Sequence, residues 1–177
     1  SENQDAIAQA GAMAPSVTML GVPSPQLQAN VAAAMASLSK GHHGNQLAIS
    51  KLGALPPLLG LVREGTSDVK DRAASAIWSL SHKNVHNKDT IAKLGGVDPL
   101  ISLLVLGTSD RSQRYVSGAL VSLCANHPDN RYTAAKRLVG YIGSPAAAIG
   151  DRGVRVLLTC SEFTRSSGSN QMALAKA

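Results

Sequence analysis

The amino-acid sequence predicts an all-α protein, a right-handed α-solenoid of about four units with three helices each. Three observations support this prediction: a motif that recurs about every 42 residues, frequent Gly and Pro between short apolar stretches, and few aromatic side chains. Aromatic residues make up 3% of the 177 residues, although 44% are hydrophobic. Because compact cores usually take much of their buried area from aromatic side chains, this composition favours closely packed helices.

The repeat consists of an Asn, a Gly eight residues later and a Pro four residues after the Gly. It begins at Asn3, Asn45 and Asn87, in steps of 42 residues, and Asn130 and Asn170 follow after 43 and 40 residues. Self-similarity at such a period is typical of repeat architectures, so the chain is predicted to be a single array. The expected units are 3–44, 45–86, 87–129 and 130–169, with the start of another at 170–177.

Each unit is predicted to contain a short first helix, a buried second helix and a long third helix. Gly53 ends a first helix, because a Gly just past a helix end adopts the left-handed conformation without steric cost. Pro57 lies where a second helix begins and no backbone N–H is needed. We expect irregular or broken helices over 130–148, since Leu138 and Ile142 replace the Gly and Pro of the motif. The predicted helices are 3–10, 13–20, 26–39, 45–52, 55–63, 68–81, 87–94, 97–105, 111–124 and 151–162.

The third helices carry an apolar stripe with the i, i+3, i+4, i+7 spacing of a core-facing helix side. The stripe consists of Ala73, Ala76, Ile77 and Leu80, of Val31, Ala34, Met35 and Leu38 one unit earlier, and of Val116, Ala119, Leu120 and Leu123 one unit later. A single unit cannot cover such a stripe, so neighbouring units are expected to stack on it.

The period, the three helices and the Gly–Pro spacing resemble the armadillo repeat. Segments 51–59 (KLGALPPLL) and 93–101 (KLGGVDPLI) are similar to the most typical stretch of that family. HEAT repeats, the nearest relatives, usually have two helices and lack this spacing. The resemblance implies a non-enzymatic scaffold or adaptor that holds a protein partner, as an extended peptide or a helix, in a concave groove lined by the third helices. Because both ends of the sequence fall inside a first helix, we expect a segment of a longer array or a subunit of a larger assembly.

The groove is expected on the side of the third helices opposite the apolar stripe. The residues predicted to contact a partner are Lys40, Asp71, Ser75, Trp78, His82, Arg114 and Arg155. Trp and Arg are over-represented among residues that dominate binding energy. The plainer interpretation of Trp78 is packing between units, since Trp is often largely buried. Seven Lys and Arg residues against two Asp over 111–155 would attract an acidic partner, and the commoner meaning of such charge is a solvated helical face.

Karyopherin alpha, the nuclear-import adaptor of the armadillo family, carries a Trp at the position of Trp78 in successive units, with an Asn four residues later. Here the Trp occurs once, and His82 stands at the Asn position. The corresponding pairs in the neighbouring units are Ala36 with Lys40 and Val121 with Ala125. The ladder that grips a basic import signal is therefore missing, and an import adaptor of this type is not expected.

The sequence gives little support for a catalytic or a metal-binding protein. His82 with His86 and Cys124 with His127 have metal-ligand spacing, but no further ligand completes either pair. Neither a phosphate loop nor a dinucleotide fingerprint is found, so we expect no enzyme, cofactor or small-molecule substrate.

The cysteines indicate a cellular compartment, and the positive charge leaves a second class of partner open. Both cysteines lie in apolar stretches, which favours the cytoplasm or another reducing intracellular compartment, and no apolar run is long enough for a membrane span. The alternative that remains is a nucleic-acid-binding solenoid that uses the basic C-terminal half. It is disfavoured because the inner face lacks the repeated base-reading side chains of such proteins.

Overall fold

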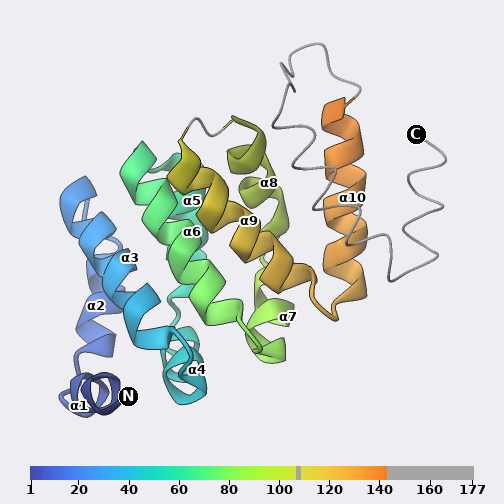
Figure 1. Ribbon diagram of the computed structural model, residues 1–177. Coiled ribbons are helices and arrows are strands. Elements are labelled where there is room, and N and C mark those ends of the chain that lie inside the picture. The colour runs from blue at the N-terminus through green and yellow to red at the C-terminus, as the bar shows by residue number, and fades with distance from the viewer. Residues whose placement is uncertain (107–108, 143–177) are drawn as a thin grey trace.

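Figure 1 shows the computed structural model, which describes residues 1–106 and 109–142; within them it contains helices and no strand. The helices are α1 (Glu2–Gln9), α2 (Met13–Met19), α3 (Pro25–Ser39), α4 (His43–Lys51), α5 (Leu55–Glu64), α6 (Ser67–Ser81), α7 (Val85–Lys93), α8 (Val97–Leu106), α9 (Asp110–Cys124) and α10 (Pro128–Ile142). The all-α prediction is confirmed, and the helices predicted from 3–10 to 111–124 are present with bounds within two residues. The predicted helix 151–162 lies outside the described residues. No helix of the described part combines the length and hydropathy that a membrane span requires.

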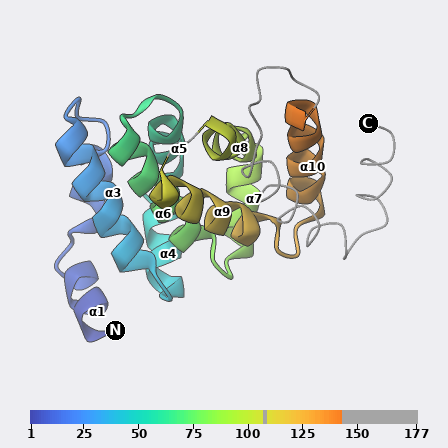
Figure 2. The ribbon, with the colours of Figure 1, turned by 45° about the horizontal axis from the view of Figure 1, so that its top comes forward.

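The long third helices form one layer of the array, and the second helices lie behind it. α6 packs against α3 on one side and against α9 on the other, so the three helices lie side by side (Figures 1 and 2). α5 packs against α6, α8 packs against α9, and α5 and α8 contact each other. Each unit thus contacts its neighbours, and the core continues from one unit into the next, as in solenoid proteins.

The predicted apolar stripe lies in this core. Its members in α6 and α9 are all buried, with Ile77 and Leu80 among the largest fully buried side chains. Ala34 in α3 is the exception, because it is exposed. Among the described helices, α6 is the one third helix that packs against α3 (Figure 1). Within the described residues, no other helix of this layer covers Ala34.

The prediction of broken helices over 130–148 is wrong for the part that the structure describes. α10 is one continuous helix of 15 residues that packs against α8 and α9. Leu138 stands where other units have the stop glycine, so no residue provides a left-handed turn, and its side chain is buried instead. Arg137 of the same turn donates to both carboxylate oxygens of Asp98 in α8, at 2.8 and 2.7 Å.

The Asn that defines the repeat caps the third helix of the preceding unit. Its side-chain Nδ2 donates to the carbonyl oxygen of the Leu seven residues earlier: Asn45 to Leu38 at 3.0 Å, Asn87 to Leu80 at 2.9 Å and Asn130 to Leu123 at 3.0 Å. These carbonyl groups belong to the last helical turn and have no partner within the helix. All three Asn side chains are buried, so the repeated Asn is explained by folding rather than by binding.

The residue after this Asn position provides a second cap, to the third helix of its own unit. Three side chains donate in this way: Gln4 to the Ser37 carbonyl at 2.8 Å, Gln46 to that of Ser79 at 2.9 Å and Lys88 to that of Ala125 at 2.8 Å. Burial lowers the pKa of Lys88, an effect that the nearby Cys124 opposes. First helices of two successive units therefore hold the C-terminal end of each third helix.

Gly53 and Gly95 end their first helices with φ angles of +84° and +65°, as expected for left-handed stop residues. Replacing Gly95 with Val should lower the free energy of unfolding by about 1–3 kcal/mol, because a β-branched residue is strained at positive φ. Open space surrounds the Cβ position, so backbone strain alone is expected to act. Gly60→Ala, at an equally open position inside α5, should leave stability unchanged or raise it. Urea unfolding followed by circular dichroism compares the variants, and an unchanged midpoint for Gly95→Val would contradict the assigned helix stop.

The capping role of the repeated Asn predicts a second effect on stability. Asn87→Ala should cost about 1–3 kcal/mol, because the carbonyl of Leu80 and that of Gln46, which accepts from Asn87 at 3.2 Å, lose a buried donor. Asn3 occupies the same repeat position but is exposed, so Asn3→Ala is the matched control and should be neutral. Thermal unfolding of both variants tests this, and equal melting temperatures would disprove the capping role.

Candidate binding groove

An open hollow of about 490 Å³ lies on the face formed by the third helices. We call it the Trp78 hollow. Residues of α3, α6 and α9 and of the turns after α3 and α6 line it: Ala36, Ser37, Lys40, Gly41, Ser75, Trp78, Ser79, His82 and Tyr115. Three consecutive units therefore contribute to one depression on the surface.

Contrast in side-chain size between units creates the hollow. Ala36 and Trp78 occupy equivalent positions, 42 residues apart, in α3 and α6. The small side chain of Ala36 leaves space beside the indole ring that a larger residue would fill. The hollow is thus open toward α3 and bounded by an aromatic wall on α6.

Trp78 also packs on the backbone of the next unit. A Cβ atom added at Gly118 of α9 would lie 2.6 Å from Cδ2 and Cε2 of the indole ring, which shows that the ring rests on this glycine. The side chain is partly buried against the core. Trp78 therefore packs between units, as the plainer interpretation expects, and also presents its remaining surface to the hollow. Because it is held on one side, it forms a rigid wall.

One charged side chain, that of Lys40, is among the described lining residues, together with the imidazole of His82. The side chains of Lys40 and His82 have no hydrogen bond or ion pair with another described residue, and no carboxylate is among the described lining residues. Hydroxyl groups of Ser75 and Ser79 add uncharged polar groups. The arrangement suits an apolar or aromatic side chain next to a negative charge.

Four of the predicted contact residues, Lys40, Ser75, Trp78 and His82, come together in this hollow. Asp71 does not. Its side chain is 5% exposed and accepts hydrogen bonds from the hydroxyl groups of Ser112 and, at 3.3 Å, of Ser109. The stacking of α9 on this end of α6 buries it, so the prediction that Asp71 faces the groove is wrong.

Arg114 is exposed on α9 but is not among the residues that line the hollow. Its neighbour Tyr115 lines the hollow instead, a residue that the helical spacing assigned to neither face. The enrichment of Tyr at interfaces is the signal that could have found it. Arg155 lies outside the described residues.

Neither suggested metal pair gains further ligands. Within residues 1–106 and 109–142, no group of three His, Cys, Asp or Glu side chains could hold a metal ion. His127 has structural contacts instead: Nε2 lies 2.9 Å from a carboxylate oxygen of Asp89, and Nδ1 accepts the backbone N–H of Asn130 at 3.2 Å. Cys124 is buried in α9.

Stacked three-helix units with an open hollow across successive third helices define the class of the molecule, an α-solenoid repeat protein. Residues 84–125 match the family model of the Armadillo/beta-catenin-like repeat. One unit of the chain therefore carries the sequence of an armadillo repeat. A comparison with curated proteins gives no match.

Solved structures with the same fold include designed proteins. A designed armadillo repeat protein matches with a TM-score of 0.73 and 22% identity, over 90% of this chain and 68% of that chain. Computationally designed armadillo repeat proteins for modular peptide recognition match with a TM-score of 0.74 and 21% identity, over 99% and 78%. Another designed armadillo repeat protein, in complex with the peptide (KR)4, matches with a TM-score of 0.70 and 19% identity, over 99% and 77%.

The contact between Trp78 and Gly118 predicts a spectroscopic change. Gly118→Ala should displace the indole ring and cost about 1–3 kcal/mol, as overpacking of a well-packed site does. Trp78 is the only Trp in the sequence, so its fluorescence emission should move to longer wavelength as the ring enters water. Gly140→Ala in α10, where nothing lies near the added Cβ, should leave the emission unchanged. Identical spectra for wild type and Gly118→Ala would show that the ring does not rest on this glycine.

Proposed function

We propose that this protein is a non-enzymatic scaffold or adaptor that holds an extended acidic segment of another protein against its third helices. The observation that carries this proposal is the Trp78 hollow, in which an aromatic wall lies beside two basic side chains and no carboxylate is among the described lining residues. A peptide complex and designs for modular peptide recognition are among the solved structures with this fold, and they support a peptide ligand.

The physical roles of the lining residues differ. Trp78 and Tyr115 offer apolar area for an anchoring side chain, and aromatic anchors of this kind often dominate binding energy. Lys40 and His82 attract a carboxylate, although single exposed ion pairs contribute little. These two side chains therefore act mainly on specificity, because they disfavour a ligand that places a positive charge in the hollow.

A basic ligand is a poor fit to this surface. One of the structurally similar designed proteins is in complex with the peptide (KR)4, whereas this chain has a net charge of +6 and a lysine in its hollow. Its single Trp also departs from the Trp–Asn ladder of karyopherin alpha. We therefore do not propose an import adaptor.

The proposal includes the compartment in which the protein works and the kind of assembly to which it belongs. Cys124 is buried in α9, where a cysteine packs as a small hydrophobic residue, and this fits the cytoplasm or another reducing intracellular compartment. Because solenoid units bind through extended surfaces, the protein is proposed to work as part of a larger assembly.

Affinity capture from native extract, quantified by mass spectrometry, tests the proposal. Trp78→Ala should lose partners that the wild type retains, since removal of an interface anchor costs about 2 kcal/mol or roughly thirtyfold in affinity. Lys40→Gln should weaken the same partners. Lys51→Gln, which removes an exposed lysine from α4 outside the hollow, is the matched control and should retain them.

Circular dichroism confirms that each variant is folded. Full retention of partners by folded Trp78→Ala would place the binding surface elsewhere. Partners that leave after nuclease treatment, or with a steep dependence on salt, would favour the nucleic-acid-binding alternative.

A further inference from the structure

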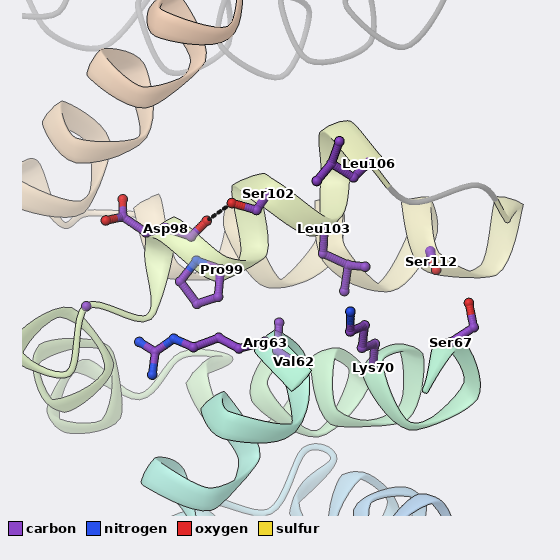
Figure 3. A pocket seen from close by; sticks show the side chains of 11 residues that line it. Val62, Arg63, Ser67, Lys70, Asp98, Pro99, Ser102, Leu103, Leu106 and Ser112 are labelled. Atoms are coloured by element: carbon purple, nitrogen blue, oxygen red, sulfur yellow. Dashed lines mark hydrogen bonds between the residues drawn. The ribbon is translucent and has the colours of Figure 1, made fainter. Parts of the chain in front are cut away.

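A second hollow, of about 650 Å³, lies where α5 and α8 of successive units pack (Figure 3). Figure 3 shows two different walls. Arg63 and Lys70 extend from α5 and α6, whereas Pro99, Leu103 and Leu106 belong to α8. We call this site the Lys70 hollow. It has a cationic side and an apolar side that face each other.

The apolar side is accessible at its rim. Leu106 is 69% exposed, and Leu103 next to it in space is partly buried against the core. Pro99 continues this surface inward and is buried. Scattered exposed leucines are common, but an apolar rim around a hollow between units is typical of an interaction site.

The cationic side has no counter-charge within the described residues. The side chain of Lys70 forms no hydrogen bond or ion pair there, and Arg63 reaches only the Leu94 carbonyl oxygen, at 3.4 Å. Asp98 is the only carboxylate among the described lining residues, and Arg137 already binds both its oxygens, at 2.8 and 2.7 Å.

The other carboxylates near these cations do not balance them. Asp68, two residues before Lys70, binds Arg72 at 2.9 Å and Arg111 at 3.2 Å. Glu64 is exposed and is not among the residues that line the hollow. The Lys70 hollow therefore has a net positive lining, which an acidic ligand would complement.

The two hollows are separate sites. Lys70 lies in the first turn of α6, and Trp78 follows eight residues later, about 12 Å along the axis and about 80° around it. The Trp78 hollow is formed by third helices, whereas the Lys70 hollow is formed mainly by second helices and the start of α6. A ligand side chain in one hollow does not occupy the other.

We propose that the Lys70 hollow is a second docking site, for a segment of a partner protein in which an apolar side chain is next to a carboxylate. The apolar side chain packs on Leu103 and Leu106, and the carboxylate pairs with Lys70 and Arg63. Charge complementarity and the apolar wall select this occupant together. The site does not require that the Trp78 hollow binds a ligand.

Nuclear magnetic resonance titration of the whole chain tests this assignment. The probe is an acetylated and amidated peptide of alternating Glu and Leu, and its counterpart carries Lys in place of each Glu. The Glu peptide should shift the amide signals of residues 67–70 and 103–106, and the Lys peptide should not. In the variant Arg63→Gln with Lys70→Gln, the affinity for the Glu peptide, measured from these signals, should fall about tenfold, since two charge pairs near the surface are lost.

A control variant has the same change in charge. Lys51→Gln with Lys93→Gln removes two exposed lysines outside the Lys70 hollow and should bind the Glu peptide as the wild type does. Equal shifts with the Lys peptide, or undiminished binding by the Arg63→Gln, Lys70→Gln variant, would overturn the proposal.

The indole N–H signal of Trp78 reports the other hollow in the same titration. If the indole signal does not shift while the amide signals of residues 67–70 do, the proposal for the Trp78 hollow fails and that for the Lys70 hollow stands. If only the indole signal shifts, the Lys70 proposal fails.

Discussion

The burial of one apolar stripe between stacked third helices is the constraint on which the rest of the structure depends. Ile77 and Leu80 of α6 are fully buried in a core that continues into the neighbouring units, and one three-helix unit could not cover them. Stacking also encloses the C-terminal ends of the third helices, whose last carbonyl groups need donors. Buried Asn side chains such as that of Asn87 supply them, so the most regular feature of the sequence follows from the same constraint.

The binding surface is a consequence of this stacking. Side-by-side third helices form a face whose shape depends on the size of the side chain at one position in each unit. That position is held by Ala36 in α3 and by Trp78 in α6. Gly118 in the next helix lets the indole ring lie flat against the layer, because any Cβ there would meet the ring. A hollow with a rigid aromatic wall therefore forms without a loop or an inserted element, and single substitutions in this layer change its shape.

Stacking also decides which charges stay available for a partner. Three carboxylates are used between units: Asp68 with Arg111, Asp71 with Ser112 and Asp98 with Arg137. Two more are used within a unit: Asp5 with His42 and Asp89 with His127. Lys40 and Lys70 have no such partner among the described residues. Both hollows consequently have basic linings, which gives the proposed preference for acidic segments a structural origin in the contacts between units.

The sequence by itself determined the helices from α1 to α9, because their stop glycines, first-turn prolines and apolar spacing act within a few residues. It also located Trp78, Lys40, Ser75 and His82, which do line one hollow. Only the tertiary structure decided that Asp71 is buried and that Tyr115, not Arg114, lines the hollow, since the side of a helix that stays open depends on how its neighbours pack. The same holds for α10: without a stop glycine, its length depends on its contacts with α8 and α9, which no local motif encodes.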